Sequence, residues 1–109
     1  MATTYKILGQ SNPSATTLTS LYTVPSATQA VVSSIVVANL AATSATFRIA
    51  VRPAGASIAN SQYVGYDITV GASDSTVLTL GITMGATDVL SVYASTSTVT
   101  FSAFGSEIA

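Results

Sequence analysis

Apolar and polar side chains alternate along the segment Ala45–Arg52. One phase of the alternation is apolar, and the other carries Arg48 and Arg52. A repeat of two residues is typical of a β-strand with one buried face, and Pro53 ends the strand because proline lacks a backbone donor. The pattern predicts a strand whose two arginines, four residues apart, project from one face.

The segment Gln29–Asn39 is apolar in both phases of the same repeat. Such a strand is typically covered on both sides. We therefore expect it to occupy a central position in a sheet or a subunit interface.

Six more segments fit the strand template, and turn-forming residues separate them. They are Tyr5–Gln10, Thr16–Val24, Gln62–Val70, Ser75–Ile82, Asp88–Ala94 and Thr98–Phe104. The alanine-rich stretches 41–42 and 54–59 predict loops or a single helical turn. Eight strands at short spacing favour an all-β fold, with residues 1–109 forming a single antiparallel β-sandwich domain. The strand count leaves two alternatives open, a jelly roll and an immunoglobulin-like sandwich.

Aromatic residues divide into predicted core and predicted surface. Phe47, Phe101 and Tyr93 are in phase with apolar neighbours and are expected in the core. Tyr63 and Tyr66 are three residues apart, so in a regular strand they point to opposite faces, and the outward one could anchor an interface or stack on a sugar.

Near the C-terminal end, Gly105 predicts a bulge or bend after the last strand. The residues that follow it are then expected to finish an edge strand.

The composition excludes much of the chemistry that enzymes use. Only seven side chains carry a formal charge, the net charge is -1, and His, Cys and Trp are absent. The usual zinc ligands, disulfides, and Ser-His or Cys-His nucleophiles are therefore excluded, and we expect no metal and no cofactor. Three basic residues cannot neutralise a run of phosphates, so nucleic acid is not an expected partner.

Low charge also predicts assembly, because an isolated sandwich usually protects its edge strands with charge, proline or bulges.

The most apolar stretch, 30–42, is interrupted by Ser33, Ser34 and Asn39 and is too short for a membrane-spanning helix. Residues 1–8 lack the pattern of a secretion signal. We expect the protein to be made and assembled inside a cell, with no membrane partner.

The four carboxylates raise the possibility of an enzyme that uses paired carboxylates. Such an enzyme would depend on Asp67, Asp74 or Asp88. Asp74 and Asp88 precede predicted strands, where aspartate commonly caps turns. Asp67 lies on a strand where it could pair with Arg48 or Arg52. These positions favour a protein that is not an enzyme.

The candidate assembly contacts are Arg48, Arg52, Tyr63 and Tyr66. The two arginines form either a small positive patch for an acidic partner surface, or solvated and intramolecularly paired side chains. Arginine and tyrosine are enriched at protein interfaces.

Four segments carry a resemblance that covers most of the chain. They are Leu21–Pro25, Ala30–Asn39, Ala45–Val51 and Phe104–Ile108. Together they resemble small virion structural proteins of tailed bacteriophages, including the head-decoration and tail-associated β-sandwich proteins of phages of cyanobacteria.

The resemblance implies a non-enzymatic component of the virion that is assembled in the host cytoplasm. It would be either a small capsid decoration (cement) protein or a tail-associated protein. Its expected partners are copies of itself, with a trimer as one form considered, and a larger virion protein such as the major capsid protein or a tail protein. The alternative is a receptor-binding or carbohydrate-binding module of a tail fibre or baseplate.

Overall fold

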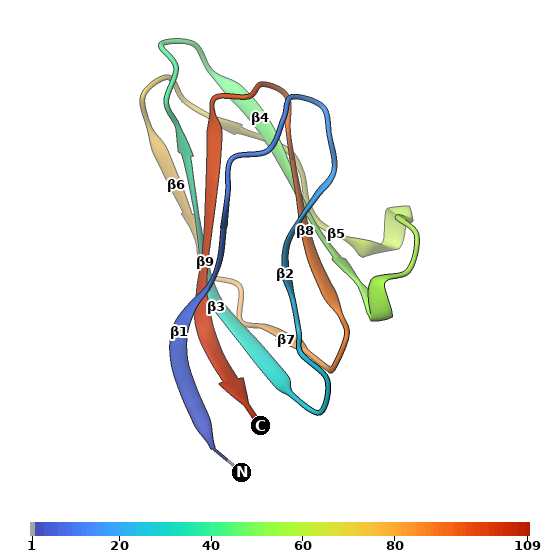
Figure 1. Ribbon diagram of the computed structural model, residues 1–109. Coiled ribbons are helices and arrows are strands. Elements are labelled where there is room, and N and C mark those ends of the chain that lie inside the picture. The colour runs from blue at the N-terminus through green and yellow to red at the C-terminus, as the bar shows by residue number, and fades with distance from the viewer. Residues whose placement is uncertain (1) are drawn as a thin grey trace.

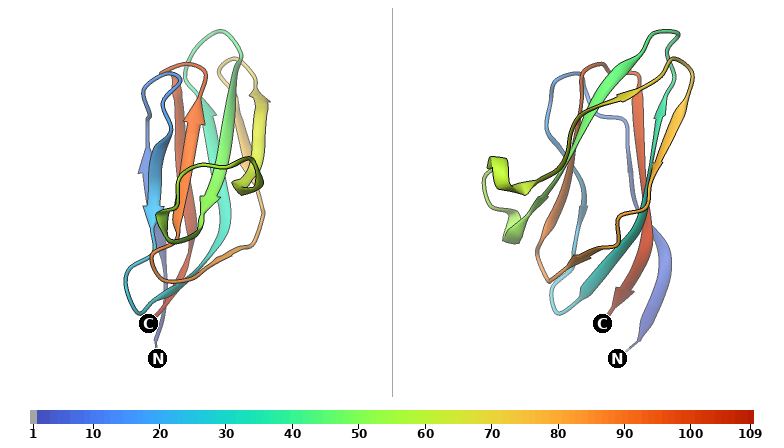
Figure 2. Two further views of the ribbon diagram at one scale, coloured as in Figure 1. Left: turned by 90° about the vertical axis from the view of Figure 1, so that its right-hand side faces the viewer. Right: turned by 180° about the vertical axis from the view of Figure 1, so that it is seen from behind.

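The computed structural model describes residues 2–109 and consists of two antiparallel β-sheets packed face to face (Figure 1). The right-hand view of Figure 2 shows the two layers side by side. The strands are β1 (Thr3–Ser11), β2 (Thr19–Thr23), β3 (Gln29–Asn39), β4 (Ala45–Arg52), β5 (Tyr63–Val70), β6 (Ser75–Leu78), β7 (Ile82–Met84), β8 (Val89–Ala94) and β9 (Val99–Ile108). Two short 3₁₀ turns, η1 (Pro53–Gly55) and η2 (Asn60–Gln62), lie between β4 and β5. No helix in residues 2–109 is long and apolar enough to cross a membrane.

The order of the strands identifies the sandwich as a jelly roll. Sheet A has the order β1-β9-β3-β6, with β7 also paired to β3, and sheet B has the order β2-β8-β4-β5. An immunoglobulin-like sandwich holds its first two strands in one sheet, whereas here β1 and β2 lie in different sheets. Each of the two layers has four strand positions, one of which β6 and β7 share, and this arrangement matches the double Greek key of a jelly roll.

The predicted all-β sandwich is confirmed, and two predicted strands have the observed bounds, Gln29–Asn39 and Ala45–Arg52. The structure has nine strands where about eight were predicted. The predicted strand Ser75–Ile82 contains β6, which ends at Leu78, and only the first residue of β7, which runs on to Met84. Both strands pair with β3. Gly81, between them, has a φ of +61°, a conformation that glycine adopts without steric cost.

The C-terminal strand also differs from the prediction. β9 does not end at Phe104 but continues through Gly105 to Ile108, and it lies between β1 and β3 instead of at an edge. A Cβ atom at Gly105 would lie 2.0 Å from the carbonyl oxygen of Val31. Glycine therefore allows a close approach of β9 to β3 beside the register shift between Val32 and Ser34.

The core lies between the inner faces of the two sheets. Phe47 on β4 and Phe101 on β9 meet edge to face, with ring centroids 6.0 Å apart, and both are buried as predicted. On β3 the inward side chains are buried, whereas the outward ones are half-buried or, at Gln29 and Ser33, exposed. The central position predicted for this strand is confirmed, whereas its outer side is only partly covered.

Asn39 connects the loops at one end of the sandwich. Its buried side-chain nitrogen donates to the carbonyl oxygens of Thr43 (2.7 Å) and Gly71 (3.2 Å). Its side-chain oxygen accepts from the Ala41 amide and the Thr98 hydroxyl, both at 3.1 Å. Every hydrogen-bonding position of this buried amide is therefore filled, as burial of a polar group requires.

Glu107 connects the two sheets at the opposite end. Its carboxylate accepts a hydrogen bond from the Tyr22 hydroxyl on β2 and one from Lys6 Nζ on β1, the latter at 3.0 Å. The hydrogen bond from Tyr22 has the larger effect and the one from Lys6 the smaller, and together they hold the pKa of Glu107 below its usual range. Burial, followed by the hydrogen bond to Glu107, raises the pKa of Tyr22.

This pairing predicts an acid-sensitive contribution to stability. Because the pKa of Glu107 is lowered in the folded state, its contribution is fully present above the ordinary value of 4.5 and is lost as the pH falls through the folded pKa. Glu107→Gln should flatten the fall in unfolding free energy between about pH 6 and about pH 3. Tyr22→Phe should cost about 1 kcal/mol at neutral pH. Urea unfolding across this pH range measures both, and an unchanged acid slope in Glu107→Gln would contradict the assignment.

Candidate functional site

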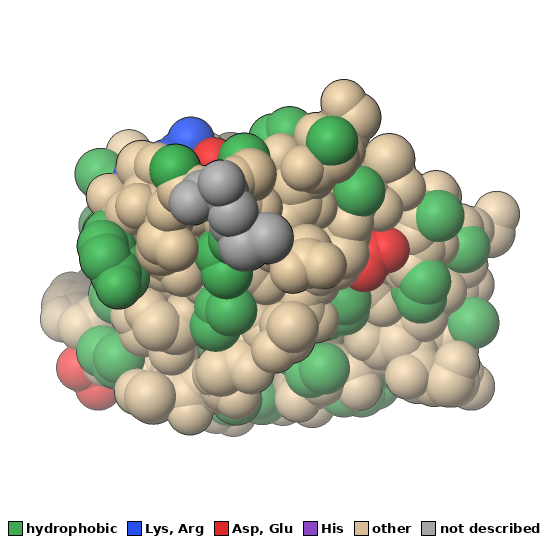
Figure 3. Space-filling view, turned by 90° about the horizontal axis from the view of Figure 1, so that it is seen from below, with side chains coloured by type: hydrophobic (Ala, Val, Ile, Leu, Met, Phe, Trp, Pro, Cys, Tyr) green, Lys and Arg blue, Asp and Glu red, His purple; other side chains and the backbone are tan. Residues whose placement is uncertain are grey.

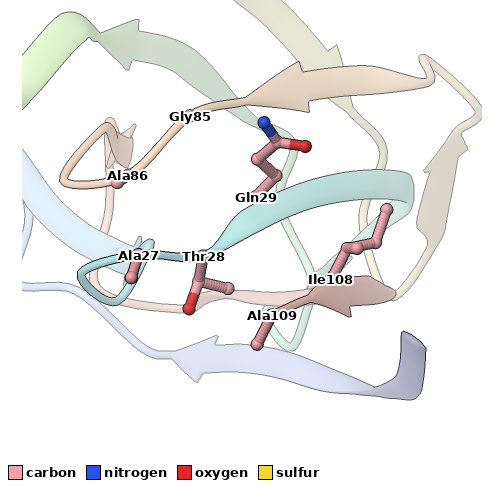
Figure 4. Close-up of a pocket in the computed structure, with 7 residues that line it drawn as sticks. All are labelled: Ala27, Thr28, Gln29, Gly85, Ala86, Ile108 and Ala109. Carbon is pink, nitrogen blue, oxygen red and sulfur yellow. The ribbon is translucent and has the colours of Figure 1, made fainter. Parts of the chain in front are cut away.

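The hollow at the end of the sandwich offers no reactive group. It has a volume of about 350 Å³ and lies between two turns and the end of β9 (Figure 4). Its lining consists of Ala27, Thr28, Gln29, Gly85, Ala86, Ile108 and Ala109. None of these side chains ionises, so the hollow provides neither a general acid nor a general base.

A cluster of aromatic and charged side chains lies on the outer face of sheet B. We call it the tyrosine cluster, and it comprises Arg48, Tyr63, Tyr66, Asp67 and Tyr93. The Arg48 guanidinium carbon lies 4.1 Å from the ring centroid of Tyr66 and 4.4 Å from that of Tyr93. The rings of Tyr63 and Tyr66 meet edge to face at 4.9 Å. Three of the four predicted contact residues, all except Arg52, therefore lie together.

A β-bulge explains why Arg48 contacts two residues of the next strand. The residues flanking Arg48 pair with Gly65 and Ile68, so two residues of β5, Tyr66 and Asp67, face Arg48 alone. Asp67 takes the extra position with a φ of 50°, a conformation that aspartate tolerates better than most residues. The bulge thus places a ring and a carboxylate beside one guanidinium.

A second bulge corrects the prediction that Tyr63 and Tyr66 point to opposite faces. Ala50 pairs with Tyr63 and the preceding Ile49 pairs with Gly65, so Val64 is an extra residue in β5. One added residue shifts the alternation of side chains by one position. Both tyrosines therefore lie on the outer face, where Tyr66 is 56% exposed.

Tyr93 is not a core residue, contrary to the prediction. It pairs with Arg48 across β8 and β4 and is only half-buried. Its phase on β8 is that of Ser91, a polar residue, whereas Leu90 and Val92 occupy the inward phase. A serine two residues before Tyr93, and therefore on the same side of the strand, was the signal in the sequence that Tyr93 faces outward.

Arg52 has a different environment from Arg48. It donates from Nε to the carbonyl oxygen of Ala56 (2.7 Å), from Nη2 to that of Gly55 (2.9 Å) and from Nη1 to the Ser91 hydroxyl (3.3 Å). These bonds hold the segment 53–62 across the outer face of sheet B, as the left-hand view of Figure 2 shows. The segment contains η1 and η2, whereas the sequence predicted a loop or a single helical turn for residues 54–59.

The charges of the tyrosine cluster are paired within the chain. Arg48 Nε lies 2.6 Å from Asp67 Oδ1, and Arg48 Nη2 lies 3.4 Å from Asp67 Oδ2. The hydrogen bond to Asp67 raises the pKa of Arg48. The pairing of Asp67 with Arg48 was one of the alternatives that the sequence left open, and it makes the cluster aromatic and polar with little net charge.

The other carboxylates are also bound by neighbouring groups. Asp74 accepts from the Ser75 amide at 2.8 Å. Asp88 accepts from the Gly85 amide (2.8 Å) and the Ala54 amide (2.9 Å). The prediction that these two aspartates cap turns is confirmed. No group of three metal-ligating His, Cys, Asp or Glu side chains occurs in the described part of the chain.

A hollow of about 430 Å³ lies beside the exposed Tyr66 and the half-buried Tyr63, and Asn60 completes its lining. Asn60 comes from η2 and was not singled out from the sequence, because its approach depends on the path of the segment 53–62. The hollow combines two ring surfaces with one amide.

The chain matches no protein-family model, and a search of curated proteins finds no matching sequence. The function is therefore inferred from the residues and the geometry described above.

The role of Arg52 can be tested by substitution. Arg52→Lys removes the planar fork that reaches two carbonyl oxygens and a hydroxyl, so the segment 53–62 should open more often. Cleavage by a nonspecific protease near Ile58 should become about tenfold faster, as expected for the loss of one or two charge-assisted hydrogen bonds. Arg48→Lys is the matched control and should leave this cleavage rate near that of the wild type. Equal rates for the wild type and Arg52→Lys would refute the role.

Proposed function

We propose that the protein is a non-enzymatic structural component of a tailed-phage virion. In this proposal it is a small capsid decoration or tail-associated protein that assembles with copies of itself and docks on a larger virion protein. The observation that carries the proposal is the tyrosine cluster, an exposed arginine-aromatic surface on a rigid sheet with no free catalytic group beside it.

The chemistry of the cluster supports a docking role. Tyrosine and arginine are the residue types that most often dominate binding energy at protein interfaces. Arg48 is held between two rings and a carboxylate, so little side-chain freedom remains to be lost on binding. Tyr66 is exposed beside it and can enter a pocket of a partner.

The fold and the composition support the same proposal. Jelly rolls recur in viral capsid proteins and in lectins, although fold alone does not determine function. Figure 3 shows one end of the molecule as a surface of hydrophobic and uncharged polar groups with few charged side chains. A surface of this kind is suited to persistent contact with other proteins.

Docking predicts that Tyr66 is a dominant contact. Particles of the phage that encodes the chain, prepared without it, should bind the purified protein, and Tyr66→Ala should weaken binding about 30-fold. Leu40→Ala is the matched control, because Leu40 is an exposed hydrophobic residue (68%) outside the cluster. Cosedimentation with heads and with tails measures both variants. The proposal fails if the wild-type protein binds neither.

The hollow beside Tyr63 and Tyr66 favours a second candidate, a carbohydrate-binding module. Sugars stack on exposed rings through their apolar faces, and an amide such as that of Asn60 can hydrogen-bond a hydroxyl. This function would reside in the isolated chain and would need no virion protein.

A glycan array probed with the isolated chain discriminates the two candidates. Under the carbohydrate hypothesis a glycan should bind and Asn60→Ala should weaken that binding about tenfold, whereas Leu40→Ala should not. Silence across the array, together with binding to particles, would exclude the carbohydrate module.

A further inference from the structure

The free edge of β1 is the longest uninterrupted one among the four sheet edges of residues 2–109. The edge formed by β6 and β7 is broken between Leu78 and Ile82. The β5 edge contains two bulges, and β2 is five residues long with a register shift after Ser20. On β1 the pairing is regular from Thr3 to Ile7, where a register shift interrupts it.

The backbone hydrogen bonds determine which groups of β1 are free. Ala2 and Ala109 donate to each other's carbonyl oxygens, at 2.9 and 3.0 Å. Because hydrogen-bonded and non-hydrogen-bonded pairs alternate in an antiparallel ladder, Thr3, Tyr5 and Ile7 direct their N–H and C=O groups away from β9. Three residues therefore present a regular row of donors and acceptors at the edge.

The side chains near this edge are apolar or uncharged apart from Lys6, whose charge is paired. Tyr5 is 84% exposed and Ile7 is 53% exposed, and both border a hollow on the outer face of sheet A that Val31 and Phe104 also line. The charge on the regular part of β1 is that of Lys6, which is paired with Glu107. None of the usual devices that prevent edge pairing, such as proline, an unpaired lysine or a bulge, lies within residues 3–7.

We propose that a second copy of this chain pairs with β1, antiparallel and about a two-fold axis at Tyr5. In this register Tyr5 pairs with Tyr5 of the second copy, and Thr3 pairs with Ile7. Thr3, Tyr5 and Ile7 of each copy, whose N–H and C=O groups point away from β9, then all find partners. The two copies exchange six backbone hydrogen bonds. The inference specifies the self-association part of the proposed function and rests on that part alone.

Charge and symmetry select this register among its neighbours. An axis at Lys6 would place the two Lys6 side chains directly opposite each other, which is unfavourable for like charges. An axis at Thr4 would pair Thr3 with Tyr5 and would leave Ile7 with no partner among the residues of β1. With the axis at Tyr5, Lys6 lies opposite Thr4, and the aromatic rings form a cross-strand pair on the outer face.

Charge complementation at residue 5 tests both the dimer and its register. The wild-type chain should sediment as a dimer. Tyr5→Lys and Tyr5→Glu should each raise the dissociation constant about tenfold, because each puts like charges opposite each other. An equimolar mixture of the two variants should recover a heterodimer close to wild-type affinity. A monomeric wild-type chain, or a mixture no tighter than either variant alone, would overturn the proposal.

Disulfide crosslinking gives a second measurement, since the chain has no cysteine of its own. Directly opposed residues in a hydrogen-bonded antiparallel pair have Cα atoms about 5.5 Å apart, within the range of a disulfide. Tyr5→Cys should therefore crosslink rapidly under mild oxidation. Val77→Cys is the matched control, because Val77 is 61% exposed on the opposite edge strand, and equally fast crosslinking there would count against the proposal.

These outcomes are separable from those of virion docking. Sedimentation uses only the isolated chain, and Tyr66→Ala should leave the dimer intact because Tyr66 lies on sheet B. A dimer that binds no particle would refute docking alone, whereas a monomer that binds particles would refute the edge pairing alone.

Discussion

The contact between Phe47 and Phe101 determines which side chains of β4 and β9 face outward. The two rings join β4 and β9, strands that lie inside their sheets, and both are fully buried. Because side chains alternate along a strand, burial of Phe47 forces Arg48 to the outer face of sheet B, where Tyr93 lies opposite it. The same alternation on β9 leaves Phe104 on the outer face of sheet A, beside the free edge. This core contact thus fixes the outward direction of Arg48 and Phe104, and the bulges of β5 then add Tyr63, Tyr66 and Asp67 to the surface around Arg48.

The period-two pattern predicted the sandwich and the central strands because burial acts on alternate residues. It gave the bounds of β3 and β4 residue for residue, and it placed Arg48 and Arg52 on one face. It could not predict the grouping of Tyr63 with Tyr66, since a bulge at Val64 depends on how β5 pairs with β4 and not on the local sequence. It also could not place β9 between β1 and β3, because strand order follows from contacts between residues far apart in the chain.

The scarcity of charge has a structural consequence within the chain. Each of the four carboxylates accepts hydrogen bonds: Asp67 from Arg48, Asp74 and Asp88 from turn amides, and Glu107 from Tyr22 and Lys6. A charge bound in this way stabilises a particular turn or closes one end of the sandwich, and it contributes little to repelling another copy. The few charges are bound within the chain, where they stabilise the domain. For the same reason they are not available to protect its edge strands.

The two proposed surfaces are compatible with each other because they lie on different parts of the sandwich. Sheet B runs from β2, near β1, to β5 at the far edge, so the tyrosine cluster on β4 and β5 lies away from the β1 edge. Pairing of two chains through β1 extends sheet A and leaves both clusters uncovered. A dimer of this kind presents two docking surfaces related by a two-fold axis, and engagement of one raises the effective concentration of the other. Weak individual contacts can then give persistent attachment wherever the larger partner repeats its binding site at the matching distance.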